Sequence, residues 1–239
     1  MNMKSTYVLP ILNETVFPSG CALCKSSPAF AEEAYFGICA ECRELLIPDT
    51  GRRCARCGRP LISEENICME CRSIDTPFFD FSIVLFPYSG KAKEFLSEYK
   101  YGTGRGAASF IAELFCQEIE NPGKNYPIFD GIVPVPPRPG KIRTKGWDQV
   151  EMIVRKMGIV SGLPVNRCLA RLSSKIQKEL DRTGRLHNLD GRIRCLEPPP
   201  VEIVLVDDVM TTGATLNECA KILKQSGAHT VLAIALCYD

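Results

Sequence analysis

The sequence has no long apolar run, and its 239 residues include only two histidines. No stretch approaches the roughly 20 apolar residues that a membrane-spanning helix needs. The short apolar patch near the start is broken by Pro10, and it has neither the length nor the cleavage site of a secretory signal. We find no histidine-based metal site and no Ser/His/Asp constellation. These absences favour a soluble cytoplasmic protein with no membrane span.

Neither sign of charge dominates the whole chain, because 29 basic residues face 28 acidic ones. This balance excludes a polybasic or polyacidic protein, and 45% apolar residues are enough for a packed core. One region is asymmetric. Residues 138–194 hold 14 lysines and arginines against five acids, a local net charge of +9. Such a block favours polyanions such as pyrophosphate or nucleic acid, with a solvated surface as the alternative.

Cysteine is abundant, and eight of the 13 cysteines lie within residues 21–71. They form four Cys-x-x-Cys pairs: Cys21/Cys24, Cys39/Cys42, Cys54/Cys57 and Cys68/Cys71. Two such pairs complete the tetrahedral sulfur site that structural zinc favours. The eight thiols therefore predict two zinc ions, and sites made only of cysteine leave no open position for catalysis.

Disulfides and a redox pair are the alternatives to zinc. Disulfides need an oxidising compartment, and a thioredoxin-like site uses one pair rather than four. For zinc, we favour sequential sites, the first pair with the second and the third with the fourth, over a cross-braced arrangement. The other five cysteines have no ligand spacing and are expected to be small buried hydrophobes.

From about residue 78, short apolar runs alternate with amphipathic stretches. This alternation predicts an α/β fold, a mostly parallel sheet of about five strands with helices on both faces. Residues 163–165 are a candidate for the fifth strand. The expected strands are 81–86, 131–135, 201–206 and 231–236, and the expected helices are 91–100, 109–119, 149–160 and 215–225.

Residues 203–216 carry the clearest chemistry. An apolar strand ends in Asp207 and Asp208, and a threonine turn (residues 211–215: Thr211, Thr212, Gly213, Ala214 and Thr215) leads into a helix. Turn amides, hydroxyls and the helix N-terminus form a cup for phosphate, and glycine allows close backbone approach. The two acids fit if they hold the hydroxyls of a sugar whose phosphate fills the cup.

Other interpretations of this segment are weaker. It lacks the Gly-Lys-Ser/Thr ending of a Walker A loop. The glycine cluster at 102–106 follows a helical stretch and lacks dinucleotide-binding spacing. A plain surface turn needs neither two acids nor three threonines.

Residues 203–215 resemble the signature by which type I phosphoribosyltransferases bind phosphoribosyl pyrophosphate (PRPP). The whole chain is similar to the ComF family, named for a competence protein of bacterial DNA uptake, which joins a cysteine-rich zinc module to this domain. The similarity includes the segments 17–24 and 130–136, together with Gln177, Arg185 and Asn188. The resemblance implies a double zinc-ribbon module at 15–75 and a type I phosphoribosyltransferase fold at 78–239.

The resemblance also assigns roles. Asp207 and Asp208 hold the ribose 2- and 3-hydroxyls, and residues 211–215 hold the 5-phosphate. The turn of Pro136, Pro137 and Arg138 contacts pyrophosphate near Mg²⁺. Lys175 and Arg185, in a basic loop that closes over PRPP, neutralise the leaving group. One departure stands out, since Asp148 replaces the family's asparagine, and we expect it to point away or contact magnesium.

Two functions follow. The first is an enzyme that transfers, or hydrolytically releases, the phosphoribosyl group with loss of pyrophosphate. The second is an accessory protein for DNA uptake, in which the zinc module and residues 138–194 bind single-stranded DNA and PRPP is only a ligand. Components of the DNA-uptake machinery are then candidate partners. The acceptor substrate has no signature in the sequence.

Overall fold

A computed structural model describes residues 20–48, 51–54, 56–61, 65–72, 77–102, 104–141, 144, 146–172 and 192–239. The helices are α2 (Ala31–Phe36), α3 (Ala40–Glu44), α4 (Met69–Arg72), α5 (Gly90–Tyr101), the 3-10 turn η1 (Gly104–Ala107), α6 (Ala108–Ile119), α8 (Gln149–Ser161) and α10 (Ala214–Gln225). The strands are β1 (Phe81–Pro87), β2 (Gly131–Pro134), β3 (Leu169–Arg171), β4 (Ile193–Cys195), β5 (Glu202–Met210) and β6 (Thr230–Tyr238).

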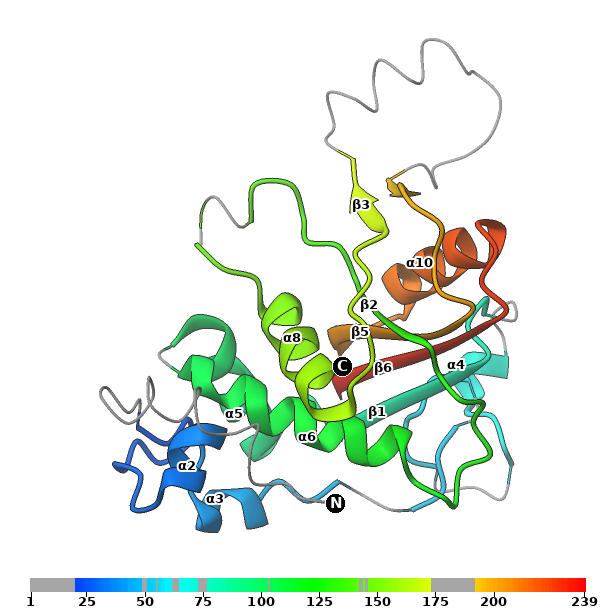
Figure 1. The fold of residues 1–239 in the computed structure, drawn as a ribbon. Coiled ribbons are helices and arrows are strands. Elements are labelled where there is room, and N and C mark those ends of the chain that lie inside the picture. The colour runs from blue at the N-terminus through cyan, green and yellow to red at the C-terminus, as the bar shows by residue number, and fades with distance from the viewer. Residues whose placement is uncertain are drawn as a thin grey trace.

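The central sheet has four parallel strands in the order β1-β6-β5-β2 (Figure 1). Its two middle strands are near-continuous apolar runs, as expected for strands that are covered on both faces. The fifth strand expected at 163–165 is reduced to a single parallel bridge between Ile132 and Val165. Pro164 removes one backbone donor there, which limits the ladder.

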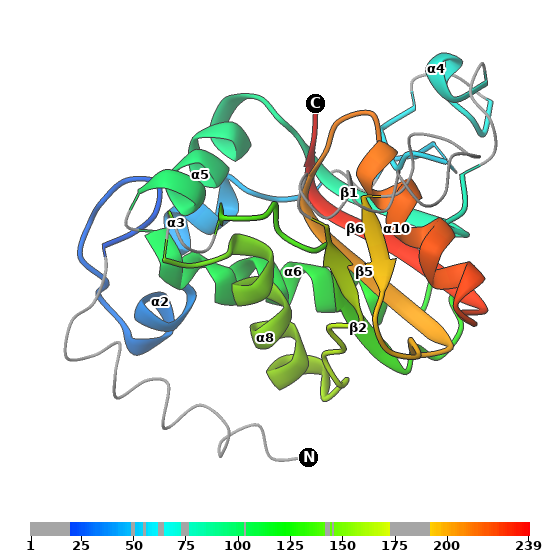
Figure 2. The same cartoon turned by 90° about the horizontal axis from the view of Figure 1, so that it is seen from above.

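Helices cover both faces of the sheet, so the predicted fold class of a mostly parallel α/β sheet with an N-terminal cysteine-rich module is confirmed. Helices α5, α6 and α8 pack on one face, where Phe95, Ile111 and Ile153 share a core cluster with alternate strand residues. Helix α10 packs on the other face through Leu216, Cys219 and Leu223. Figures 1 and 2 show α10 on the opposite side of the sheet from α6 and α8.

The cysteine-rich segment touches the α/β domain in two places. Its first half, with α2 and α3, lies beside α5 and α6, and its second half, with α4, lies beside β1 on the α10 side (Figures 1 and 2). Gly37 shows how close the first contact is, because a Cβ atom there would lie 2.5 Å from the Ala107 nitrogen.

A small antiparallel pair of strands, β3 and β4, was missed by the sequence analysis. Leu169 pairs with Cys195 and Arg171 with Ile193 across it. Strands of three residues carry too little periodicity to be recognised in a sequence. Among the described helices, none combines the length and the apolar character that crossing a bilayer requires.

Candidate functional site

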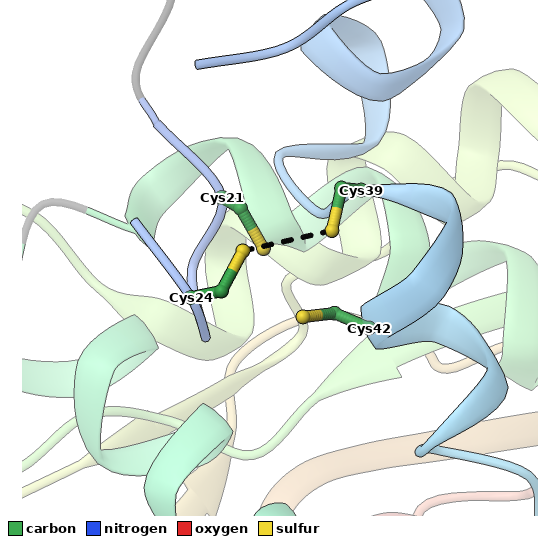
Figure 3. A group of neighbouring side chains, drawn as sticks. All are labelled: Cys21, Cys24, Cys39 and Cys42. Carbon is green, nitrogen blue, oxygen red and sulfur yellow. Dashed lines mark hydrogen bonds between the residues drawn. The ribbon is translucent and has the colours of Figure 1, made fainter. Parts of the chain in front are cut away.

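The eight cysteines form two groups, each with all four sulfurs within 4.8 Å of one another. Cys21, Cys24, Cys39 and Cys42 make the first group, whose sulfurs converge in Figure 3, and Cys54, Cys57, Cys68 and Cys71 make the second. This arrangement confirms the sequential pairing and excludes the cross-braced one. None of these thiols forms a disulfide in the structure.

Both groups fit zinc. A tetrahedron with zinc–sulfur bonds of about 2.3 Å has sulfur–sulfur edges of about 3.8 Å. The Cys24 and Cys39 sulfurs lie 3.7 Å apart, and so do those of Cys57 and Cys68. Backbone amides face the sulfurs, since Leu23 N–H donates to Cys21 Sγ and Cys68 N–H to Cys54 Sγ. These eight residues would hold two structural zinc ions.

The acid pair lies inside β5, not at the end of a shorter strand as expected. Asp207 pairs with Ala235, and the ladder to β6 continues to Met210 because β6 extends to Tyr238. Asp208 N–H donates to Asp207 Oδ1 at 2.8 Å. Burial, together with the charge of Asp208, raises the pKa of Asp207 to about 7.

Lys100, at the end of α5, is a site residue that the sequence analysis missed. Its Nζ lies 2.9 Å from Asp208 Oδ1, and the two side chains are only 16% and 15% exposed. The position is held from both sides, because Gln149 Nε2 donates to the Lys100 carbonyl and Tyr99 Oη donates to the Gln149 carbonyl. Lys100 is therefore the counter-charge of Asp208. Nothing in the local sequence indicates this pairing, which joins segments more than 100 residues apart.

The threonine turn follows β5 directly. Gly213 has φ 74° and caps α10, which begins at Ala214, one residue before the expected start. This left-handed backbone suits glycine, which carries no Cβ atom. Thr211 and Thr212 are exposed, and Thr212 Oγ1 accepts the Ala214 N–H at 3.3 Å. Thr215 lies in the first turn of the helix.

The expected pyrophosphate turn lies beside the acid pair. Strand β2 is the parallel neighbour of β5, and Val135 N–H donates to the Val206 carbonyl just before Asp207. Parallel strands end at the same edge of a sheet, so residues 136–138 leave the sheet next to the acids. Pro136 is buried and Arg138 is exposed. Lys175 and Arg185 lie outside the described residues.

Asp148 turns toward its own helix. Its Oδ1 accepts the Glu151 N–H at 3.0 Å and caps α8, and its Oδ2 lies 2.8 Å from Lys141 Nζ. The segment from Asp148 to Glu151 has the spacing of a helix-capping box, a signal that could have revealed this role. Trp147 packs edge-to-face on Tyr99, with ring centroids 5.5 Å apart.

The threonine turn also borders a cavity of about 650 Å³. Its opposite wall is the second zinc ribbon, through Arg56 and Arg59. Asp207 and Asp208 do not line this cavity.

Known proteins resemble this chain over most of its length. The family model of the double zinc ribbon domain matches residues 12–72. Competence protein ComFC of Bacillus subtilis is 29% identical over 199 residues, covering 80% of this chain and 79% of that protein. DNA utilization protein YhgH of Salmonella typhi is 26% identical over 226 residues, covering 92% and 97%.

A solved structure with partial similarity is the glutamine PRPP amidotransferase of B. subtilis, at 17% identity and a TM-score of 0.37. The match covers 58% of this chain and only 30% of that one.

Proposed function

We propose that this protein, a member of the ComF family, binds magnesium–PRPP at the junction of β5 and α10 and transfers or hydrolytically releases its phosphoribosyl group. The observation that carries the proposal is the continuity of the site. Two adjacent carboxylates on a central parallel strand are followed, after Val209 and Met210, by a threonine turn with glycine at a helix N-cap. That combination suits a sugar phosphate.

Each part of the site has a role in this proposal. The Asp207 and Asp208 carboxylates accept hydrogen bonds from the ribose 2- and 3-hydroxyls. The amides and hydroxyls of residues 211–215 donate to the 5-phosphate. Pro136, Pro137 and Arg138 face the pyrophosphate. Magnesium, whose preferred ligands are oxygens, would supply positive charge on the departing group.

The main requirement of this reaction is positive charge placed next to the departing pyrophosphate, because an oxocarbenium-like sugar forms as the pyrophosphate leaves. Lys175 and Arg185 supply that charge in the proposal. Lys100 also affects ribose binding, because the ribose hydroxyls compete with its ammonium group for the Asp208 carboxylate. Water must be excluded in transfer, since hydrolysis competes with it.

Calorimetric titration of magnesium–PRPP into the zinc-loaded protein tests this proposal. The wild-type protein should bind, and the Asp207→Ala/Asp208→Ala variant should lose at least 100-fold in affinity. Asp80→Ala, on the far edge of the sheet, is the matched control and should bind normally. Equal binding by the double variant would contradict the proposal. Pyrophosphate release with nucleobases, ammonia or water as acceptor then tests turnover.

A second candidate function is binding of single-stranded DNA, with PRPP as a ligand only. The names of the relatives, a competence protein and a DNA utilization protein, favour it, as does the +9 charge of residues 138–194. Affinity for an oligonucleotide should then fall steeply with added salt, because counterions are released from the phosphates. A flat salt response would exclude this function. Components of a DNA-uptake machinery are the partners that it implies.

Two further proposals concern the whole chain. The first is a division of the chain into a zinc module at 15–75 and a phosphoribosyltransferase-like domain at 78–239. A cytoplasmic location is proposed because the eight ligand thiols must stay reduced to hold zinc.

A further inference from the structure

The two zinc clusters differ in how accessible their cysteines are. Cys24 is exposed, and it is the one exposed residue among the thirteen cysteines, all of which lie in the described part of the chain. Cys21 and Cys42, its partners in the first cluster, are only 3% and 6% exposed. In the second cluster Cys54 is buried, and the other three are of intermediate exposure. A small reagent in solution therefore reaches the first cluster through Cys24.

A second sulfur lies close to that of Cys24. The Cys24 and Cys39 sulfurs are 3.7 Å apart and are joined by the dashed line in Figure 3. A disulfide bond is about 2.05 Å long, so a small movement brings the two sulfurs to bonding distance. Zinc keeps its thiol ligands deprotonated, and reactivity toward oxidants follows thiolate character and exposure. Cys24 thus combines an accessible thiolate with a neighbour that can complete a disulfide.

The turn that carries Cys24 has a strained backbone. Lys25 has φ 65°, and it is the one non-glycine residue with a positive φ in the described part of the chain. The second ribbon has Gly58, with φ 70°, at the same place after its first cysteine pair. A left-handed backbone suits glycine and is unfavourable for lysine. Zinc bound by Cys21 and Cys24 would hold this turn closed against that preference.

The same turn is attached to α5. Lys25 Nζ lies 2.6 Å from Glu98 Oε1, and Glu98 is two residues before Lys100. Ala22 lies against the chain just after α5, because a Cβ atom on Gly104 would be 3.1 Å from the Ala22 Cβ atom. A change in the turn therefore acts directly on the end of α5.

We propose that Cys24 is a site of reversible oxidation by peroxides, through which the first zinc ribbon acts as a redox switch on α5. Hydrogen peroxide oxidises the Cys24 thiolate to a sulfenic acid, and its O–O bond breaks to release hydroxide. The Cys39 thiolate then attacks that sulfur, so that the S–S bond forms, the S–O bond breaks and a second hydroxide leaves. Two of the four zinc ligands are lost, which frees the metal and lets the turn at Lys25 relax. A thiol reductant and zinc restore the ribbon.

Peroxide treatment of the full-length, zinc-loaded protein tests the proposal. One of the two zinc ions should be released about 10-fold faster than the other, as measured with a chromogenic chelator. Peptide mass mapping should find the first disulfide between Cys24 and Cys39, and dithiothreitol with added zinc should reverse it. Release of both ions at the same rate overturns the proposal. A first disulfide between any other two cysteines also overturns it.

Histidine variants separate oxidation from zinc binding. Cys24→His keeps a nitrogen ligand for zinc but cannot form the disulfide. It should hold two zinc ions and lose the fast release, whereas Cys71→His, the matched change in the second ribbon, should keep it. Fast release from Cys24→His contradicts the proposal, and so does its loss from Cys71→His. The disulfide mapping on the wild-type protein does not depend on how either variant folds.

Hydrogen–deuterium exchange reports the effect on α5. Peptides covering residues 95–101 should exchange faster after oxidation, and peptides covering α10 should not change. Unchanged exchange in α5 would show that the ribbon does not act on that helix. None of these measurements uses PRPP, so their outcome is independent of the proposed function.

Discussion

The carboxyl group of Asp207 holds its proton more tightly than an ordinary aspartate does. Burial comes first among the causes, followed by the charge of Asp208, and the pKa rises from 3.8 to about 7. The folded protein therefore keeps a proton that the unfolded chain has lost between about pH 4 and pH 7. In that window the unfolded state binds fewer protons, so the free energy of unfolding falls as the pH rises.

Asp207→Asn should remove this effect. We expect the variant to be more stable than the wild type at pH 8, by about 1–3 kcal/mol, and the difference to shrink toward pH 5. Urea unfolding at several pH values measures it. Glu94→Gln, on the exposed surface of α5, serves as the control and should show no such growth. A gain in stability for Asp207→Asn that is independent of pH would contradict the raised pKa of Asp207.

Asp148 is the second residue whose role can be tested singly. Asp148→Ala removes both the cap of α8 and the partner of Lys141, and should cost about 1–3 kcal/mol in the free energy of unfolding. Asp148→Asn keeps an acceptor for the Glu151 N–H and should be the milder change. It also removes a negative charge near the proposed pyrophosphate turn, so magnesium–PRPP should bind at least as tightly as to the wild type. Weaker PRPP binding by the asparagine variant would show that the carboxylate itself contacts the ligand or its metal.

At the level of elements, the sequence predicted what local periodicity encodes. The four main strands and the four long helices lie where their apolar runs and amphipathic stretches placed them, within a few residues at each end. The exact end of β5 was wrong because its length is set by pairing with β6. Lys100 was missed because its contact with Asp208 depends on how α5 packs beside the sheet. Local sequence carries no information about such a pairing.

The second zinc ribbon also covers an edge of the sheet that would otherwise be exposed. Strand β1 is an edge strand, and Arg53 donates to the carbonyls of Val84 and Leu85 on it. Ser82 Oγ donates back to the Arg56 carbonyl at 2.9 Å. Gly58 packs directly on the strand, where a Cβ atom would lie 3.0 Å from the Val84 nitrogen. Covering an edge in this way prevents pairing with other chains.

Arg53→Met should therefore uncover part of that edge. We expect a loss of about 1–3 kcal/mol in stability and a rise in concentration-dependent self-association, while both zinc ions remain bound. Differential scanning fluorimetry and sedimentation velocity measure the two effects. Arg52→Met is the matched control, since the hydrogen bond that its guanidinium gives to Asn66 stays within the ribbon. An Arg53→Met variant that matches the wild type in stability and in self-association would show that the ribbon does not protect the edge.

At the scale of the whole molecule, the first zinc ribbon shares its core with the α/β domain. Ile38 is fully buried, and it belongs with Cys42 and Leu46 to the same apolar cluster as Phe95 of α5. The cysteine spacing predicted the metal sites, but not this shared core, because it forms between distant segments. Metal in the first cluster should therefore stabilise the α/β domain as well as the ribbon itself.

Cys42→Ser tests this coupling. The variant should bind one zinc ion instead of two and should lower the unfolding temperature of the whole chain by more than 5 °C, because a structural zinc site contributes directly to folding. Cys116→Ser, at a buried cysteine outside both clusters, controls for the loss of a thiol and should keep two zinc ions. Zinc content by mass spectrometry and limited proteolysis report the result. Loss of one zinc with an unchanged transition of the α/β domain would contradict the coupling.

Hydrogen–deuterium exchange with and without magnesium–PRPP is the most direct test of the central claim, because it locates the ligand on the chain. Slower exchange is expected in peptides that cover residues 207–216 and 134–138, with the first ribbon unchanged. Protection that leaves the acid pair and the threonine turn unaffected would contradict the account, wherever else on the molecule it occurred.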